Sequence, residues 1–243
     1  MAACHENQDR MVFERISLAA HPGSLPDAIA LNFNPADGDA SCFERFGVVC
    51  PPSVARAVPK RKAEYLAGRR VAIHSLRDAG IDVADLGTDS SRAPLWPDGY
   101  TGSITHSHDM AAAIALRKGE VPGVGIDLEP VASTDAMVAI MQVALSPSEQ
   151  RALTPLALHV GEPTAVTIAF SAKESFYKAT AAEVGHVFDF TALRITSVCV
   201  DRGVVEAKVA EALTPTLVPG RKFLLGFSVL GGGAVFTSCA WRR

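Results

Sequence analysis

The sequence has no long apolar run, no paired cysteines and no excess of positive charge. Because no run of about 18 apolar residues occurs, we expect no membrane-spanning helix and no membrane binding. The five cysteines are scattered without a Cys-x-x-Cys pair, which argues against a disulfide framework or a zinc site. Charged residues between His5 and Arg15 leave no apolar core for a signal peptide. These absences together predict a cytoplasmic protein.

The formal net charge of −3 is low for a general nucleic-acid binder, so we expect no nucleic-acid partner. Hydrophobic residues make up 48% and charged residues 20% of the 243 residues, which is typical of a folded globular protein. The length suffices for one large domain or for two smaller ones.

The pattern of apolar and turn residues predicts a helix followed by a hairpin, twice along the chain. We therefore expect an α+β fold of two similar lobes, each a small antiparallel sheet with packed helices, at 1–130 and 131–243. Two lobes within one chain make a monomer the simplest expectation. The elements expected are helices at 59–79, from Ser146, and at 171–182, and strands at 111–116, 124–128, 193–198, 223–230 and 234–241.

The predicted strand at 124–128 carries two carboxylates. Side chains alternate along a strand, so Asp127 and Glu129 share one face with Gly123 and Gly125, and the apolar residues share the other. Two carboxylates about 7 Å apart repel each other unless a cation lies nearby, and oxygen ligands suit Mg²⁺. A solvated strand face with two ordinary acids remains the alternative.

The segment around Lys173 and Glu174 has two interpretations. Ser171 and Glu174 fit a helix-capping box, with Glu174 and Lys178 forming a surface ion pair. Alternatively, Glu174 supplies a third metal ligand, while Lys173 and Lys178 neutralise phosphate oxygens near a helix N-terminus.

Two further segments could bind an anion. The hydroxyl of Thr105 and the ring of His106 could hold a phosphate, or could simply end a strand. Arg61 and Arg69 are eight residues apart on the predicted helix at 59–79, so they lie near one face. Two guanidinium groups on one face suit a phosphate, although a solvated helix face is the plainer reading.

The order of these motifs carries more information than any one of them. Four motifs follow one another along the chain: Arg61-x-x-Glu64-Tyr65-Leu66-x-Gly68-Arg69, Trp96-Pro97-x-Gly99-x-x-Gly102-Ser103-Ile104-Thr105-His106, Gly125-Ile126-Asp127-x-Glu129, and Phe170-Ser171-Ala172-Lys173-Glu174-x-x-x-Lys178-Ala179. In this order they resemble the motifs of the 4′-phosphopantetheinyl transferases of the surfactin-synthetase-activating and enterobactin-synthase-component-D type.

The resemblance implies two pseudo-symmetric lobes forming one transferase unit, with coenzyme A in the cleft between them. It also implies the reaction, which is transfer of 4′-phosphopantetheine from coenzyme A to a serine of an apo acyl or peptidyl carrier protein. The leaving group would be adenosine 3′,5′-bisphosphate. The carrier could belong to a fatty-acid, polyketide, non-ribosomal peptide or siderophore synthase.

By motif position, the resemblance makes Asp127, Glu129 and Glu174 the Mg²⁺ ligands. It makes Lys173 and Lys178 neighbours of the diphosphate. Glu174 is the expected base for the carrier serine, directly or through a metal-bound water, with Lys178 and Asp127 also catalytic.

The remaining predicted contacts to coenzyme A lie elsewhere along the chain. The resemblance makes Thr105 and His106 contacts of the nucleotide, and Arg61 and Arg69 contacts of the 3′-phosphate, joined by Arg92. Phe188 would lie near the pantetheine arm.

Three rival readings stay open at this point. The chain could be a catalytically inactive homologue that binds coenzyme A or a carrier protein, an unrelated Mg²⁺-dependent phosphohydrolase, or a plain interaction module. The presence of Asp127, Glu129, Glu174 and Lys178 argues against the inactive homologue. A phosphohydrolase would leave the arginine helix and His106 unexplained, and an interaction module would not need acids and lysines in this order.

Overall fold

A computed structural model describes residues 12–35, 38–89, 93–119 and 121–242, and these fall into two compact units. The first unit combines the segment ending at Ser17 with Pro26–Arg117, and the second combines Leu18–Leu25 with the chain from Lys118 onward. The boundary predicted between the two lobes lies at residue 130 instead. The strand that follows residue 118 pairs with the C-terminal strand, and therefore belongs to the second unit.

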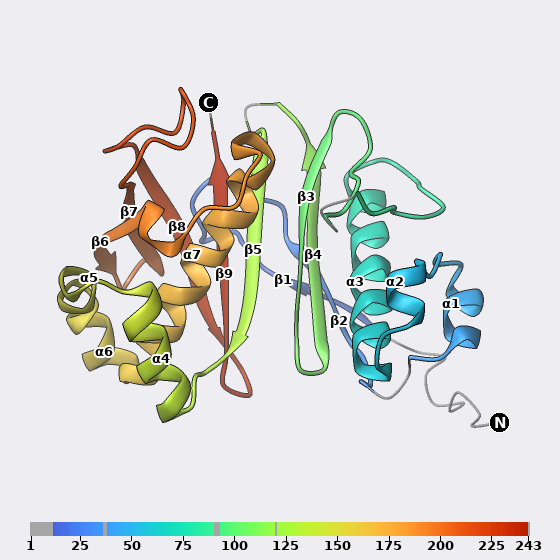
Figure 1. The fold of residues 1–243 in the computed structure, drawn as a ribbon, viewed down its shortest axis with the longest axis horizontal. Coiled ribbons are helices and arrows are strands. Elements are labelled where there is room, and N and C mark those ends of the chain that lie inside the picture. Colours follow the sequence, from blue (N-terminus) through green and yellow to red (C-terminus); the bar gives the residue numbers. More distant parts are fainter. Residues whose placement is uncertain (1–11, 36–37, 90–92, 120, 243) are drawn as a thin grey trace. The chain divides into compact units, whose positions relative to one another are not determined.

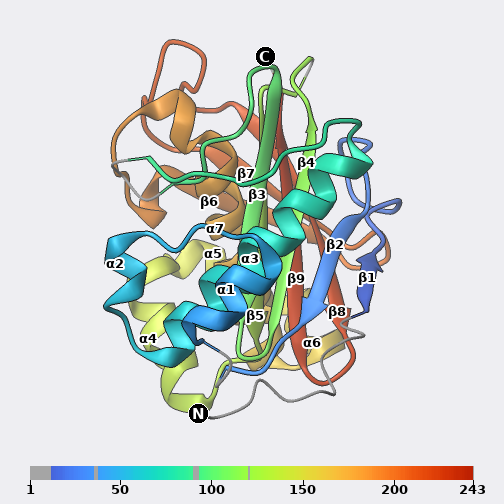
Figure 2. The ribbon, with the colours of Figure 1, turned by 90° about the vertical axis from the view of Figure 1, so that its right-hand side faces the viewer.

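The first unit is a four-stranded antiparallel sheet with one long helix and two short ones. The strand order is β1-β2-β4-β3, and Figure 2 shows α3 crossing the sheet in front of β3 and β4. Its elements are β1 (Phe13–Ile16), β2 (Ala28–Asn32), α1 (Ala40–Phe46), α2 (Pro52–Ala55), α3 (Pro59–Asp78), β3 (Tyr100–Ser107) and β4 (Met110–Arg117).

Helix α3 confirms the helix predicted at 59–79. Proline at its first position suits the missing N–H partner there, and Gly80 follows its end with φ of +90°. Its buried face includes Val71, Ala72 and Leu76, and the Ser75 hydroxyl accepts a hydrogen bond from the β4 backbone at Ala115. The helix is thereby fixed on the sheet through both apolar and polar contacts.

The second unit is a five-stranded antiparallel sheet with helices packed on it (Figure 1). The strand order is β5-β9-β8-β7-β6. Its elements are β5 (Gly123–Pro130), α4 (Thr134–Ala144), α5 (Pro147–Ala152), α6 (Thr154–Val160), α7 (Glu162–Val184), a 3₁₀ turn η2 (Phe190–Ala192), β6 (Leu193–Cys199), β7 (Val204–Val209), β8 (Lys222–Leu230) and β9 (Ala234–Trp241). These two sheets with their helices confirm the predicted α+β class, and the ligand cleft stays a prediction.

Helix α7 corrects the helix predicted at 171–182. It begins at Glu162, so Ser171 lies inside the helix and cannot cap it. The hydroxyls of Ser171 and Ser175 instead lie 2.8 Å and 2.6 Å from the Thr237 hydroxyl of β9. The prediction that a helix begins at Ser171 and binds phosphate with its N-terminus is therefore wrong.

The segment Leu18–Leu25 packs on the sheet of the second unit through His21. The ring nitrogens lie 2.7 Å from the Ser238 hydroxyl and 2.9 Å from the Ser228 hydroxyl. Gly226 makes this possible, since a Cβ there would lie 2.3 Å from His21 Cγ. Burial lowers the His21 pKa to about 4, so the ring is neutral at pH 7.

No helix in the described part of the chain is both long and apolar enough to span a membrane.

Candidate active site

The centre of the candidate site is the contact between β5 and α7 (Figure 1). A Cβ on Gly123 would lie 2.0 Å from the Ala179 carbonyl oxygen, and one on Gly125 would lie 1.9 Å from that of Ser175. The two glycines therefore let the helix backbone approach the strand on the face that carries Asp127. Helix α7 therefore covers the strand face that the two glycines share with Asp127.

This close approach pairs Asp127 with Lys178. The Lys178 ammonium lies 2.6 Å from Asp127 Oδ1 and also donates to the Ile126 carbonyl at 3.2 Å. Asp127 is only 3% exposed, so its carboxylate needs such a partner. The pair is therefore a partly buried ion pair and not a surface contact.

Glu129 and Glu174 extend the same cluster. Burial raises the pKa of Glu129 to about 7, and the charges of Asp127 and Glu174 add to the increase while Lys178 opposes it. Burial and then the Asp127 charge raise the pKa of Glu174, again against Lys178. The three carboxylates thus lie close enough to repel one another, with one ammonium among them.

The chemistry of this group of side chains fits a divalent cation. Three carboxylates and one lysine leave excess negative charge and oxygen donors, which is what Mg²⁺ prefers. As the side chains lie, however, no three His, Cys, Asp or Glu residues within the described ranges converge tightly enough to hold a metal ion. Bound Mg²⁺ would need Asp127, Glu129 and Glu174 to turn toward a common point.

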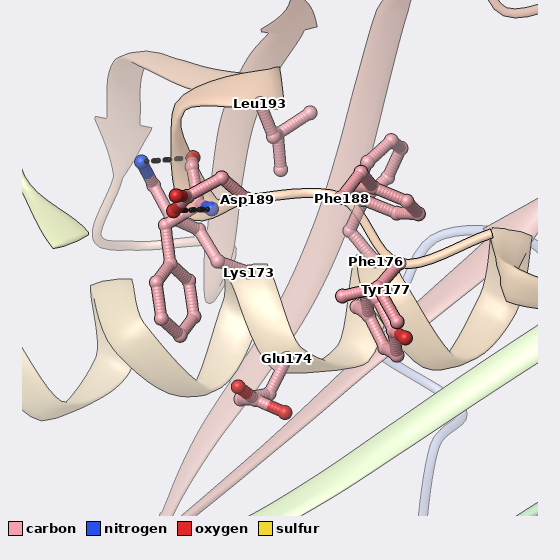
Figure 3. A pocket seen from close by; sticks show the side chains of 9 residues that line it. Lys173, Glu174, Phe176, Tyr177, Phe188, Asp189 and Leu193 are labelled. Atoms are coloured by element: carbon pink, nitrogen blue, oxygen red, sulfur yellow. Dashed lines mark hydrogen bonds between the residues drawn. The ribbon is translucent and has the colours of Figure 1, made fainter. Parts of the chain in front are cut away.

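Lys173 lies apart from this cluster, contrary to the prediction that it meets a diphosphate. Figure 3 shows Lys173 and Glu174 leaving opposite sides of α7. The Lys173 side chain is almost fully buried, and its ammonium lies 2.7 Å from the carboxylate of Glu149. Successive helix residues point about 100° apart, so when Glu174 joins the acids its neighbour turns into the core.

A pocket of about 450 Å³ opens beside Glu174. Its aromatic wall comes from α7 and from the chain that follows it, with Phe188 4.8 Å from Tyr177 and 5.9 Å from Phe176 between ring centroids. Phe188, predicted near a pantetheine arm, therefore lines a pocket next to the predicted base (Figure 3).

Within the first unit, Arg61 and His106 meet. Arg61 Nη1 lies 3.1 Å from His106 Nε2 and 3.4 Å from a carboxylate oxygen of Glu64. Thr105, the preceding β3 residue, is buried. Gly68 of α3 allows this packing, since a Cβ there would come within 3.1 Å of Ile104.

Arg69 contacts different neighbours from Arg61. Its Nη2 donates to the Thr88 hydroxyl at 2.8 Å, its guanidinium lies 4.5 Å from the centre of the Tyr65 ring, and the Tyr65 hydroxyl is 3.2 Å from Thr88 Oγ1. Thr88 is not among the predicted site residues, because a lone threonine in a loop gives no signal by itself. Arg92, predicted to join this group, lies outside the described residues.

Models of two protein families match consecutive parts of the chain. The 4′-phosphopantetheinyl transferase N-terminal domain matches residues 51–116, and the 4′-phosphopantetheinyl transferase superfamily matches residues 123–214. The first match includes α3 and β3, and the second includes β5 and α7.

Curated relatives agree with these matches. Enterobactin synthase component D of Salmonella typhi is 40% identical over 146 residues, which cover 59% of this chain and 59% of the relative, so the chain spans about three fifths of that protein. The 4′-phosphopantetheinyl transferase PptT of Mycobacterium tuberculosis is 36% identical over 53% of this chain and 55% of its own length. The 4′-phosphopantetheinyl transferase Svp of Streptomyces mobaraensis is 35% identical over 77% of this chain and 75% of its own length. The chain therefore belongs to the 4′-phosphopantetheinyl transferase superfamily.

Proposed function

We propose that the protein transfers 4′-phosphopantetheine from coenzyme A to a serine of an apo carrier domain, releasing adenosine 3′,5′-bisphosphate. The observation that carries the proposal is the cluster at the β5–α7 contact, where three carboxylates and Lys178 gather beside an aromatic pocket. Membership in the superfamily supports the choice of substrate.

Glu174 is the proposed base. The carrier serine hydroxyl is a poor nucleophile, and its oxygen forms a new bond to the β-phosphorus of coenzyme A as Glu174 takes its proton. The bond from that phosphorus to the bridging oxygen breaks, and the nucleotide leaves with the bond electrons. A carboxylate whose pKa is raised by burial holds this proton better than an exposed glutamate would.

The other residues of the cluster orient and neutralise. Lys178 holds Asp127 in place and adds positive charge near the reacting diphosphate. Asp127, Glu129 and Glu174 would hold Mg²⁺, which when bound offsets the negative charge of the diphosphate. Phe188 and Tyr177 would exclude water along the pantetheine arm, while Arg61, Arg69, Thr105 and His106 would meet the nucleotide.

The test is mass spectrometry of apo-carrier domains incubated with coenzyme A and Mg²⁺. The panel should include siderophore, non-ribosomal peptide, polyketide and fatty-acid carriers. Siderophore carriers should be tested first, because several relatives are named enterobactin synthase component D. We expect one carrier serine to gain a phosphopantetheine group.

Asp127→Asn and Glu174→Gln should each reduce transfer at least about 100-fold while remaining folded, because each removes a charge that acts on the reacting groups. Glu162→Gln, an exposed substitution in the first turn of the same helix, is the matched control and should transfer at the wild-type rate. Binding of coenzyme A without transfer to any carrier would favour an inactive homologue, and release of phosphate would favour a hydrolase.

A further inference from the structure

A buried ion pair that the proposed mechanism does not use lies directly behind the catalytic face of α7. Lys173 and Glu149 are 2% and 3% exposed, and their charged atoms are 2.7 Å apart. Burying two charges is costly, and a pair of apolar side chains often stabilises a fold equally well. Stability alone therefore does not explain why these two charges are buried together.

The three donors of the Lys173 ammonium are all used. Besides Glu149 Oε1, it donates to the Ala144 carbonyl at 2.7 Å and to the Phe190 carbonyl at 3.0 Å. These partners lie at the end of α4, at the start of α5 and in η2. One side chain of α7 thus ties three separate segments to the helix that carries Glu174.

Glu149 completes this network from the other side. Its Oε1 also accepts a hydrogen bond from the Ile195 backbone N–H at 2.9 Å, which fixes the start of β6. Its Oε2 accepts from the backbone N–H and the hydroxyl of Ser146, at 2.8 Å and 2.7 Å, in a capping box. The carboxylate therefore has partners on both oxygens and holds the lysine in one place.

The segment held in this way is a wall of the pocket beside Glu174. The wall includes Phe188, Asp189, Phe190 and Leu193, and Lys173 lies at its base (Figure 3). The tether at the Phe190 carbonyl and the one at the Ile195 N–H bracket Leu193. Aromatic contacts also join α7 to this wall, between Phe170 and Phe190 and between Phe176 and Phe188, but they are less directional than a hydrogen bond.

We propose that Lys173 and Glu149 are positioning residues, which hold the 187–193 wall at a fixed distance from Glu174 so that the pocket fits the pantetheine arm. The inference rests on the proposed function for the identity of the arm. Lys173 thus acts on the wall of the pocket and not on the diphosphate. Glu149, which belongs to none of the sequence motifs, holds Lys173 in position.

The decisive variant is the double substitution Glu149→Gln with Lys173→Met. It removes both charges at similar volume, so the fold should survive, whereas either single substitution strands one buried charge. The glutamine can still accept from the Ile195 N–H, and the tether to Phe190 is lost. We expect a thermal midpoint close to that of the wild type, a rise in KM for coenzyme A on the order of tenfold, and a much smaller change in kcat.

Ser146→Ala is the matched control. It removes the hydroxyl that bonds Glu149 Oε2 and leaves the lysine tether intact, so KM should stay at the wild-type value even where stability falls. A double variant with wild-type KM would show that the pair is only structural and would overturn the inference.

Hydrogen exchange gives a readout that does not depend on turnover. The amides of 187–193 should exchange faster in the double variant than in the wild type and in Ser146→Ala. Unchanged exchange there would overturn the inference whatever the enzyme does. Failure of the wild-type protein to modify any carrier would instead overturn the proposed function and leave this comparison valid.

Discussion

At the scale of single residues, the surroundings of Arg69 support its proposed contact with a phosphate. Arg69 is only 5% exposed, and within the described ranges it has no carboxylate partner and its Nε has no hydrogen-bond acceptor. A buried charge without a counter-ion is costly, and a phosphate would offset it. The Tyr65 ring and the Thr88 hydroxyl fix the position of the guanidinium.

Thr88→Val should weaken the binding of coenzyme A, because it deletes the one hydroxyl that bonds both Tyr65 and Arg69. We expect KM for coenzyme A to rise at least about tenfold, since a lost hydrogen bond to a charged group costs about 1.5–3 kcal/mol. Steady-state kinetics with coenzyme A and with its 3′-dephospho form make the comparison.

Thr88→Ser is the control for this site, since it keeps the hydroxyl and should behave like the wild type. If Arg69 meets the 3′-phosphate, KM for the dephospho form should change little in Thr88→Val. An equal rise for both donors would argue against that contact.

At the scale of elements, the site depends on how closely α7 approaches β5. The strand pattern predicted correctly that Asp127 and Glu129 share a face with two glycines. It could not show that a helix backbone covers that face, because the helix that begins at Glu162 is divided in two when Ser171 is interpreted as a cap. Ser171 and Ser175 bond a threonine of β9, a partner more than 60 residues away along the chain.

Gly125→Ala should force the two elements apart, because the new methyl group would lie 1.9 Å from the Ser175 carbonyl oxygen and 2.7 Å from the Ala179 nitrogen. We expect a loss of about 2–3 kcal/mol in the free energy of unfolding, typical of overpacking, and a loss of transfer activity. Chemical denaturation and the carrier assay measure the two effects.

The control for this substitution is Gly231→Ala in the β8–β9 turn, where a Cβ would have no neighbour within 4 Å. That variant should keep the stability and the activity of the wild type. Wild-type activity in Gly125→Ala would show that the site does not need the close β5–α7 approach.

At the scale of the whole molecule, the two units are not consecutive along the chain. Leu18–Leu25 belongs to the second unit although the strands before and after it, β1 and β2, belong to the first. His21 fixes this segment on β8 and β9 through Ser228 and Ser238. The stability of the second unit therefore depends on residues near the start of the chain.

His21 should make the second unit less stable in mild acid. Its folded-state pKa of about 4 lies below the unfolded value of 6.5, so below pH 6.5 the unfolded chain binds the proton more readily. The stabilisation is complete above pH 6.5 and is lost as the pH falls toward 4. Between pH 7 and pH 5 the loss should be about 2 kcal/mol.

The two tryptophans permit this measurement, because Trp96 lies in the first unit and Trp241 in the second. In a Trp96→Phe background, denaturation followed by fluorescence reports the second unit. His21→Gln removes the titrating ring, so its stability difference from the parent should shrink by about 2 kcal/mol between pH 7 and pH 5. A constant difference would contradict the assigned burial of the ring.

The sequence by itself determined the α+β class, the long helix α3, the last hairpin and the family, because these follow from short-range periodicity and from motif order. It also predicted Asp127, Glu174 and Lys178 as site residues, and the structure brings these three side chains together while their catalytic roles stay a prediction. The tertiary structure alone decided where Lys173 points, since residue 173 could turn to solvent, phosphate or core until Glu149 was brought beside it. The contacts of Thr88 and His21 were likewise decided by the tertiary structure. Their partners lie 19 to more than 200 residues away along the chain, and only folding brings them together.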